Sequence, residues 1–231
     1  MNLTIFDIDG VLTNTLDLDD EIYIETIYEL FFKKIEKNKF EKYKFAAKGA
    51  DSGVTIEFFK EEFDIDPTIE EINNVKSIFI KNLKNRSLDY PELFKEIPGS
   101  SKFFKNLQVR EDIALGIATG SWQESGIIKL DSIGIEIEGI FYGNSDDFNN
   151  KFDIVKHVIQ QAKEFEIDGF YENIFYIGDS IWDAMAAKEL EIEFIGIDSA
   201  QNGALVNAGC NRVFRDFLHD RENILDVIFH S

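Results

Sequence analysis

The sequence is poor in several features that would place it in particular protein classes. It contains one cysteine, Cys210, among 231 residues, so no disulfide can form within the chain and a reducing, cytoplasmic setting is expected. No apolar run approaches the roughly 18 residues of a membrane-spanning helix. The first residues lack the basic and apolar segments of a signal peptide. We therefore expect neither a signal peptide nor membrane insertion.

Basic residues are also scarce. The chain has 24 lysines and arginines against 44 aspartates and glutamates, which gives a formal net charge of −20 at pH 7. A chain this acidic repels nucleic-acid phosphate and anionic lipid at long range, so neither is expected as a partner. An anionic substrate would need local positive charge, for which a bound metal ion is the obvious source. Nothing in the sequence indicates an oligomeric state.

Hydrophobic residues make up 44% of the chain and include 22 phenylalanines, which is enough for a well-packed core. Apolar runs of four to six residues, rich in isoleucine and phenylalanine, alternate with segments of helical periodicity. This alternation predicts an α/β fold with a Rossmann-like, doubly wound parallel sheet. The predicted strands are residues 3–8, 113–118, 139–142, 174–177 and 192–197, and the helices between them are residues 121–132, 152–165 and 181–190.

One long interval interrupts the alternation. About 100 residues between the first two predicted strands have little strand character, and the apolar spacing in residues 20–37 is helical. Asp66 and Pro67 are typical of a helix start, as N-cap and first helical residue. We predict an all-helical cap domain over residues 15–94, inserted into an α/β core domain formed by residues 1–14 and 95–231.

Polar residues follow the predicted strands at the points where the strands end. In open α/β sheets, ligands bind beyond the carboxyl ends of the strands, so these residues are expected to converge. A lone Asp-x-Asp pair carries little information in so acidic a chain, but the pair Asp7 and Asp9 follows a strand and precedes a glycine. The converging residues are Asp7, Asp9, Gly10, Thr119, Gly120, Ser121, Lys151, Asp179 and Asp183.

These motifs resemble those of the haloacid dehalogenase superfamily, in its branch of phosphatases with a helical cap. Phosphoglycolate phosphatases and beta-phosphoglucomutases belong to this branch. The resemblance rests on residues 7–13, Thr119, Lys151 and residues 178–183, and it extends to Pro98 and Gly99, where the chain leaves the predicted cap. One departure occurs: the family often has proline after the motif lysine, whereas Phe152 follows Lys151 here. Lys156 is the competing candidate for that lysine.

The resemblance implies a set of roles at one site. Asp7 would be the nucleophile that forms an aspartyl-phosphate, and Asp9 would protonate the leaving oxygen and then activate water. Lys151 would neutralise charge on Asp7 and on the phosphoryl group. The remaining implied roles are phosphate binding by Thr119, Gly120 and Ser121, and Mg²⁺ binding by the side chains of Asp7 and Asp179 and the carbonyl of Asp9, with Asp183 as a further ligand or an anchor.

The loop formed by residues 48–53 lies between predicted cap helices. Most such segments are plain interhelical loops. The functional interpretation is a substrate-specificity loop, in which Lys48 and Gly49 reach the substrate.

The sequence thus predicts a Mg²⁺-dependent phosphatase that acts on small phosphorylated metabolites. A phosphomutase that acts on a sugar phosphate shares nearly all of these motifs and stays open as an alternative. A haloacid dehalogenase needs neither Asp9 nor the pair Asp179 and Asp183, so the presence of these residues argues against this alternative. A phosphate-sensing module carries its acceptor aspartate after a later strand and lacks the long insertion.

Overall fold

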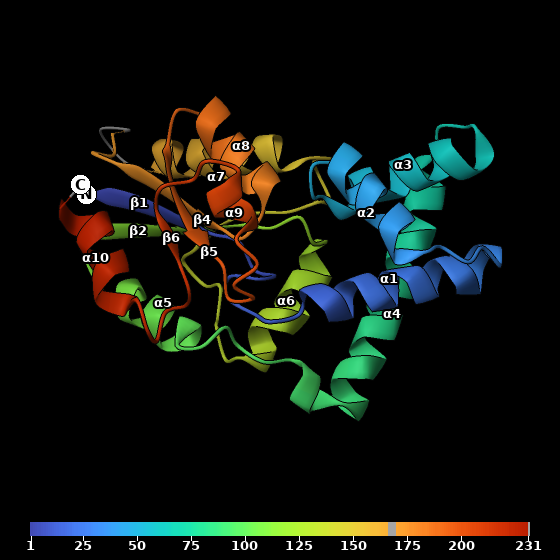
Figure 1. Ribbon diagram of the computed structural model, residues 1–231, viewed down its shortest axis with the longest axis horizontal. Helices are drawn as coiled ribbons and strands as arrows, with labels where there is room; N and C mark the ends of the chain where they lie inside the picture. Colours follow the sequence, from blue (N-terminus) through green and yellow to red (C-terminus); the bar gives the residue numbers. More distant parts are fainter. Residues whose placement is uncertain (166–169, 231) are drawn as a thin grey trace.

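A computed structural model describes residues 1–165 and 170–230 and contains one parallel sheet at its centre (Figure 1). The spatial order of the strands is β3-β2-β1-β4-β5-β6, and every pairing is parallel. The predicted fold class is therefore confirmed. The strands are β1 (Asn2–Phe6), β2 (Ile113–Ala118), β3 (Phe141–Gly143), β4 (Ile174–Gly178), β5 (Glu193–Ile197) and β6 (Val213–Phe214).

Helices cover both faces of the sheet, which explains why its strands are largely apolar. Leu3 and Ile5 of β1 pack towards α7 and α8, whereas Phe6 packs with residues of α5, α6 and α10 on the other face. The helices of this part are α5 (Ser100–Gln108), α6 (Gln123–Ser132), α7 (Lys151–Phe165), α8 (Ile181–Glu189), α9 (Ala204–Asn207) and α10 (Arg221–His230).

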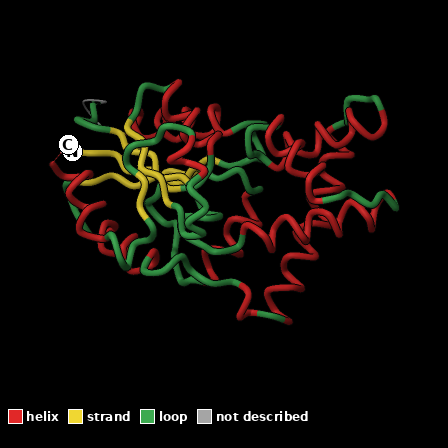
Figure 2. The backbone as a smooth tube through the Cα atoms, viewed as in Figure 1, coloured by secondary structure: helices red, strands yellow, loops and turns green. Residues whose placement is uncertain are grey.

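Residues 16–93, between β1 and α5, form a separate helical layer beside one end of the sheet, as Figure 2 shows. Its buried side chains, including Tyr23, Phe58 and Phe79, make a hydrophobic cluster of their own. The helices are α1 (Leu16–Phe31), α2 (Lys37–Ala46), α3 (Asp51–Phe63) and α4 (Ile69–Asp89), followed by the short η1 (Pro91–Leu93). In the described ranges, no helix combines the length and the apolar character needed to cross a membrane. The boundaries of the cap at residues 15 and 94 stay a prediction.

Two local predictions in the cap differ from the structure. Asp66 does not cap α4: the N-cap is Thr68, whose hydroxyl accepts from the backbone N–H of Glu71 while the Glu71 carboxylate accepts from the backbone N–H of Thr68. This reciprocal pair satisfies two helix-end donors at once, which the Asp66 side chain could not do from outside the first turn. Helix α2 was not predicted, because its sequence is dominated by lysine and has no clear apolar stripe.

The cap is docked on the core through buried contacts. Trp122, at the start of α6, belongs to the hydrophobic cluster of the cap, and its indole N–H donates to the Ser52 hydroxyl at 2.9 Å. The backbone N–H of Ser52 donates to the Ser145 hydroxyl at 2.8 Å. Lys76 of α4 pairs with Asp146 at 2.8 Å. These contacts hold α3 and α4 against the edge of the sheet where the strands end.

The packing predicts that truncation of a buried side chain on one face of the sheet strongly lowers the stability of the fold. Phe104 is fully buried and contacts Phe6 with ring centroids 5.2 Å apart. Phe104→Ala should lower the free energy of unfolding by about 3–5 kcal/mol, because the transfer free energy is lost and a cavity remains. Phe32→Ala, at a side chain that is 82% exposed, should change it by less than about 0.5 kcal/mol. Urea denaturation of both variants measures the difference, and equal losses would contradict the assigned core.

Candidate active site

The first strand places two aspartates at the carboxyl edge of the sheet. Asp7 follows the last residue of β1, and its backbone N–H donates to the Ile177 carbonyl of the neighbouring β4 at 2.9 Å. Gly10 then turns the chain with φ +75°, and a Cβ atom at this position would lie 2.0 Å from the Asp179 carboxylate. Only glycine fits this backbone conformation and this close approach. The turn therefore brings the ends of β1 and β4 together at one point.

Lys151 lies against the predicted nucleophile. Its ammonium is 2.5 Å from Asp7 Oδ2 and 3.2 Å from Asp183 Oδ1, and its side chain is almost completely buried. Burial raises the pKa of Asp7 to about 7 although Lys151 opposes the shift. Lys156, the alternative lysine, instead lies over the ring of Phe152 and is exposed. The structure thus brings Lys151, rather than Lys156, to Asp7.

Three carboxylates gather beside this contact. Asp7, Asp179 and Asp183 each offer an oxygen within 4.8 Å of the others. Burial, and then the charges of Asp183 and Asp7, raise the pKa of Asp179 well above its ordinary value. No described residue donates a hydrogen bond to the Asp179 carboxylate. Oxygen donors and uncompensated negative charge are what Mg²⁺ requires, so these residues fit a divalent cation.

Asp183 is held more tightly than the other two carboxylates. Its Oδ1 accepts from the Tyr176 hydroxyl at 2.7 Å, and its Oδ2 accepts from the backbone N–H of Ser180 at 3.1 Å as well as from the Ser180 hydroxyl. Asp183 occupies the third helical position of the capping box that starts α8. It also contacts Lys151. These bonds fix its position, which favours the role of an anchor among the two that the sequence left open.

The side chain of Asp9 points away from the acidic group and into a second cluster. Its Oδ1 accepts from the Thr15 hydroxyl at 2.6 Å, and its Oδ2 accepts from Ser121 at 2.9 Å and from Lys129 at 2.8 Å. Burial alone would raise the pKa of Asp9, but Lys129 and these hydroxyl groups hold it below its ordinary value. Ser121, predicted to bind phosphate, places its hydroxyl on Asp9 instead.

Lys129 was not predicted from the sequence. It lies on α6 with no exposed surface and contacts Asp19 as well as Asp9. Asp9 and Asp19 raise its pKa against the opposing effect of burial. A weak signal existed, because Ser125 and Lys129 stand four residues apart among apolar residues and therefore share one face of the helix. Both are fully buried.

Thr119 and Gly120 lie where β2 ends, facing the cap. Thr119 is fully buried, and its hydroxyl accepts from the backbone N–H of Ser121 at 3.1 Å. The Gly120 carbonyl accepts from the backbone N–H of Asp51 at 2.9 Å. The structure thus brings both predicted phosphate-binding positions to the same edge as Asp7, beneath the start of α3.

The two predicted residues of the cap loop lie differently. Gly49 lines the cavity described below with φ +73°, and a Cβ atom there would lie 2.2 Å from the indole nitrogen of Trp182. Lys48 is exposed, and its side chain is not among the residues that line the cavity. Lys44, one helical turn earlier on α2, lines the cavity and bonds both oxygens of Asp20 at 2.9 and 2.8 Å. The role of Lys48 stays a prediction.

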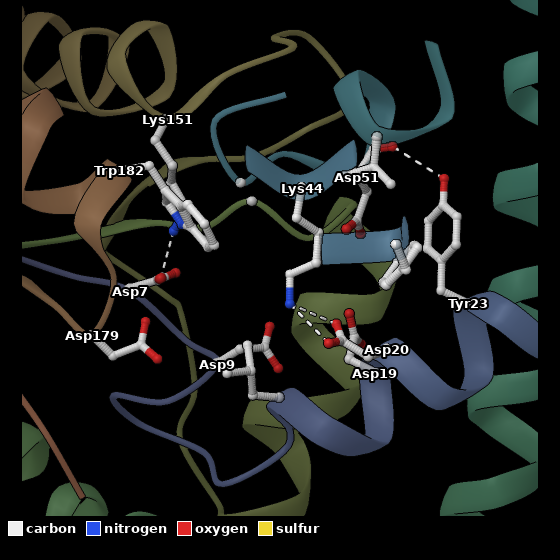
Figure 3. Close-up of a pocket in the computed structure, with 15 residues that line it drawn as sticks. Asp7, Asp9, Asp19, Asp20, Tyr23, Lys44, Asp51, Lys151, Asp179 and Trp182 are labelled. Carbon is white, nitrogen blue, oxygen red and sulfur yellow. Dashed lines mark hydrogen bonds and ion pairs between the residues drawn. The ribbon is translucent and has the colours of Figure 1, made fainter. Parts of the chain in front are cut away.

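A cavity of about 60 Å³ separates the cap from the sheet edge (Figure 3). It has room for only a few water molecules. The core side of its lining consists of Asp7, Asp9, Gly120, Lys151, Asp179 and Trp182. The cap side consists of Leu16, Asp19, Asp20, Tyr23, Phe40, Lys44, Gly49, Asp51 and Val54.

A doubly wound sheet with carboxylates and a buried lysine at its carboxyl edge defines an enzyme of the α/β class. A profile of haloacid dehalogenase-like hydrolases matches residues 4–197. The chain therefore belongs to this family, which confirms the resemblance found in the sequence. A search of curated protein sequences returned no match.

Solved structures share the fold over nearly the whole chain. A hydrolase from Pseudomonas syringae is 20% identical, covers 98% of this chain and 99% of its own, and has a TM-score of 0.74. A protein from Bacteroides vulgatus, named by prediction as a beta-phosphoglucomutase, is 14% identical over 100% and 91% of the chains with a TM-score of 0.70. A protein from Clostridium acetobutylicum, named as a predicted phosphatase, is 18% identical over 97% and 98% with a TM-score of 0.67.

The buried pair of Lys44 and Asp20 predicts a pH-dependent stability difference. Burial raises the pKa of Asp20 to about 6 although Lys44 opposes the shift, whereas an unfolded aspartate titrates near about 4. Between these values the folded chain binds more protons than the unfolded chain, so this carboxyl makes stability fall as pH rises. Relative to Asp20→Asn, the wild type should therefore lose free energy of unfolding from pH 4 to pH 6.

Urea denaturation at several pH values measures this difference. Asp17→Asn is the matched control, since Asp17 lies on the same helix with an exposed side chain. If the free energy of unfolding of the wild type, relative to that of Asp20→Asn, rises between pH 4 and pH 6, the raised pKa of Asp20 is contradicted.

Proposed function

We propose that this chain is a Mg²⁺-dependent phosphatase that hydrolyses small phosphorylated metabolites through an aspartyl-phosphate intermediate. The observation that carries the proposal is the environment of Asp7. Its carboxylate lies 2.5 Å from the buried ammonium of Lys151 and in one group with Asp179 and Asp183. A nucleophilic carboxylate can approach an anionic phosphate only where positive charge offsets both.

In the first step, an oxygen of Asp7 attacks phosphorus and the bond to the ester oxygen breaks. The leaving oxygen takes a proton from Asp9, and the phosphoryl group stays on Asp7. In the second step, Asp9 accepts a proton from water, the water oxygen bonds to phosphorus, and the bond to Asp7 breaks. Inorganic phosphate and the free alcohol are the products. Covalent catalysis of this kind splits one difficult displacement into two easier ones.

The groups around Asp7 have supporting roles in both steps. Lys151 neutralises charge on the phosphoryl oxygens, and the hydroxyl of Thr119 with the backbone N–H of Gly120 holds them. The side chains of Asp7 and Asp179 and the backbone carbonyl of Asp9 would hold Mg²⁺, and Asp183 would anchor Lys151 beside them. When bound, the ion supplies a Lewis acid that offsets the negative charge of carboxylate and phosphate. Phosphate monoesters need accelerations of up to about 10²¹, which calls for several such devices together.

The bonds to Thr15, Ser121 and Lys129 hold the Asp9 side chain in one position, which supports its two proposed proton transfers. The contact with Lys129 favours the carboxylate form, which is the form that activates water in the second step. Protonation of the leaving oxygen in the first step requires the other form. A substrate that lies against Asp9 and displaces water from it favours that neutral form.

The alternatives predict different products or requirements. A haloacid dehalogenase would use Asp7 but would have no need of Asp9 or of the carboxylates of Asp179 and Asp183. A phosphomutase would direct a second substrate hydroxyl, instead of water, to the phosphoryl group. A phosphate-sensing module would release no alcohol. The buried carboxylates near Asp7 support the phosphatase. A cytoplasmic location, expected from the single cysteine, stays a prediction.

Replacement of the proposed nucleophile should abolish turnover while the fold persists. Asp7→Asn should lower kcat for p-nitrophenyl phosphate on the order of 10⁴-fold or more, as removal of a nucleophile does in other enzymes. The amide has nearly the same shape as the carboxyl group, so circular dichroism and the urea midpoint should not show unfolding. Asp17→Asn should retain wild-type activity. Hydrolysis by Asp7→Asn near the wild-type rate would remove Asp7 from this role.

Removal of divalent cations should stop the reaction reversibly. EDTA should abolish hydrolysis of p-nitrophenyl phosphate, and excess Mg²⁺ should restore it, because carboxylates and phosphate would otherwise repel each other. Urea denaturation should show that Mg²⁺ stabilises the wild type and has less effect on Asp179→Asn, since binding to the folded state alone adds stability. Release of halide from a haloacid without metal would support the dehalogenase instead.

A further inference from the structure

The cavity has two halves that differ in how their charge is balanced. Figure 3 shows Asp7, Asp179 and Lys151 on one side of Asp9, and Lys44, Asp19, Asp20 and Asp51 on the other. In the first half, the three grouped carboxylates and the ammonium of Lys151 leave a formal charge of −2. A divalent cation balances this charge, and the proposed function therefore accounts for the first half.

The second half would face the leaving group of the substrate, which is the alcohol released on hydrolysis. Three carboxylates from the cap lie here, those of Asp19, Asp20 and Asp51. Lys44 and Lys129 are the described ammonium groups that contact them. This half therefore has more carboxyl groups than ammonium groups, even without Asp9.

Both ammonium groups are already engaged. Lys44 bonds the two oxygens of Asp20 at 2.9 and 2.8 Å, and Lys129 contacts Asp9 and Asp19. Asp51 has no cationic partner within ion-pair distance among the described residues. Its Oδ2 accepts from the backbone N–H of Trp122 at 3.3 Å.

An anionic group would find no free positive charge in this half, and burial of an unpaired charge is strongly unfavourable. Hydroxyl and ammonium groups would find carboxylate acceptors instead, and bonds to charged acceptors are stronger than those between neutral groups. Leu16, Phe40 and Val54 also line the cavity, and their apolar side chains offer no partner to an anionic group.

We propose that the substrate is a phosphate monoester of a small alcohol that carries hydroxyl or amine donors and no second anionic group. This inference rests on the proposed function, because it concerns the leaving group of the same reaction. It separates the chain from enzymes for phosphorylated acids, such as phosphoglycolate, and from enzymes for bisphosphates.

Two pairs of compounds with matched carbon skeletons test the inference. Glycerol 3-phosphate and 3-phosphoglycerate differ by an alcohol against a carboxylate, and phosphoethanolamine and phosphoglycolate differ by an ammonium against a carboxylate. Released phosphate, measured with Mg²⁺ present, gives kcat/KM for each compound. We expect the member without the carboxylate to be preferred at least tenfold in both pairs. Equal values, or a preference for the carboxylates, would overturn the inference.

Variants show whether the cap carboxylates cause the preference. Asp51→Asn removes the carboxyl group that has no cationic partner, and Asp20→Asn frees Lys44 to bind an anion. Each should lower the ratio of kcat/KM within a pair by about tenfold or more. Asp17→Asn on the outer surface of α1 should leave the ratio unchanged. Because either buried variant could destabilise the fold, circular dichroism accompanies the assay, and one folded variant with an unaltered ratio is enough to reject this cause.

Hydrolysis of p-nitrophenyl phosphate distinguishes failure of the proposed function from failure of the inference about the leaving group. If the wild type does not hydrolyse it, the proposed function fails, and the inference fails with it. If hydrolysis depends on Asp7 but the carboxylate members are the better substrates, only the inference fails. If none of the four compounds is turned over, they are compared as inhibitors of this reaction. Stronger inhibition by the members without a carboxylate supports the inference, and any other order overturns it.

Discussion

Contacts between buried ammonium groups and carboxylates determine what this cavity can bind. Lys151 holds Asp7 and Asp183 on one side, and Lys129 holds Asp9 and Asp19 on the other. Burial nevertheless raises the pKa of Asp7 and of Asp19 to about 7, against the opposing charges of these lysines. A cavity whose carboxylates exceed its cations favours added positive charge and hydrogen-bond donors. The proposed metal ion and the proposed leaving group meet this same requirement in different halves of the cavity.

The order of elements along the chain explains why catalytic and cap residues are coupled. Helix α1 begins at Leu16, only a few residues after Asp9, so the turn that ends β1 also fixes the start of the cap. Thr15, just before the helix, bonds Asp9, and Asp19, in the first turns, shares Lys129 with it. A movement of α1 therefore changes the surroundings of Asp9. Asp9, the proposed proton-transfer group, is thus bonded directly to the start of the cap.

The parts of the site that follow strands could be predicted, because the carboxyl ends of parallel strands meet at one edge whatever the helices do. Asp7, Thr119 and Asp179 are found there for this reason. The partners contributed by helix faces could not be predicted in the same way. Lys44 lies on α2, whereas Lys48 lies beyond the end of this helix with φ +51°. The packing of Phe40 and Tyr43 in the cap cluster turns Lys44 towards the cavity, and α2 itself gave no periodic signal. Lys129 was missed because a lysine on a helix is usually exposed.

The contacts that close the cap also complete the second half of the cavity. Asp51 lines the cavity, while its backbone N–H bonds the Gly120 carbonyl and its side chain accepts from the Trp122 backbone. Asp51 therefore links the cap to the core at the same place where its carboxyl group lines the cavity. Selection against anionic leaving groups consequently depends on the contacts that hold the cap on the core.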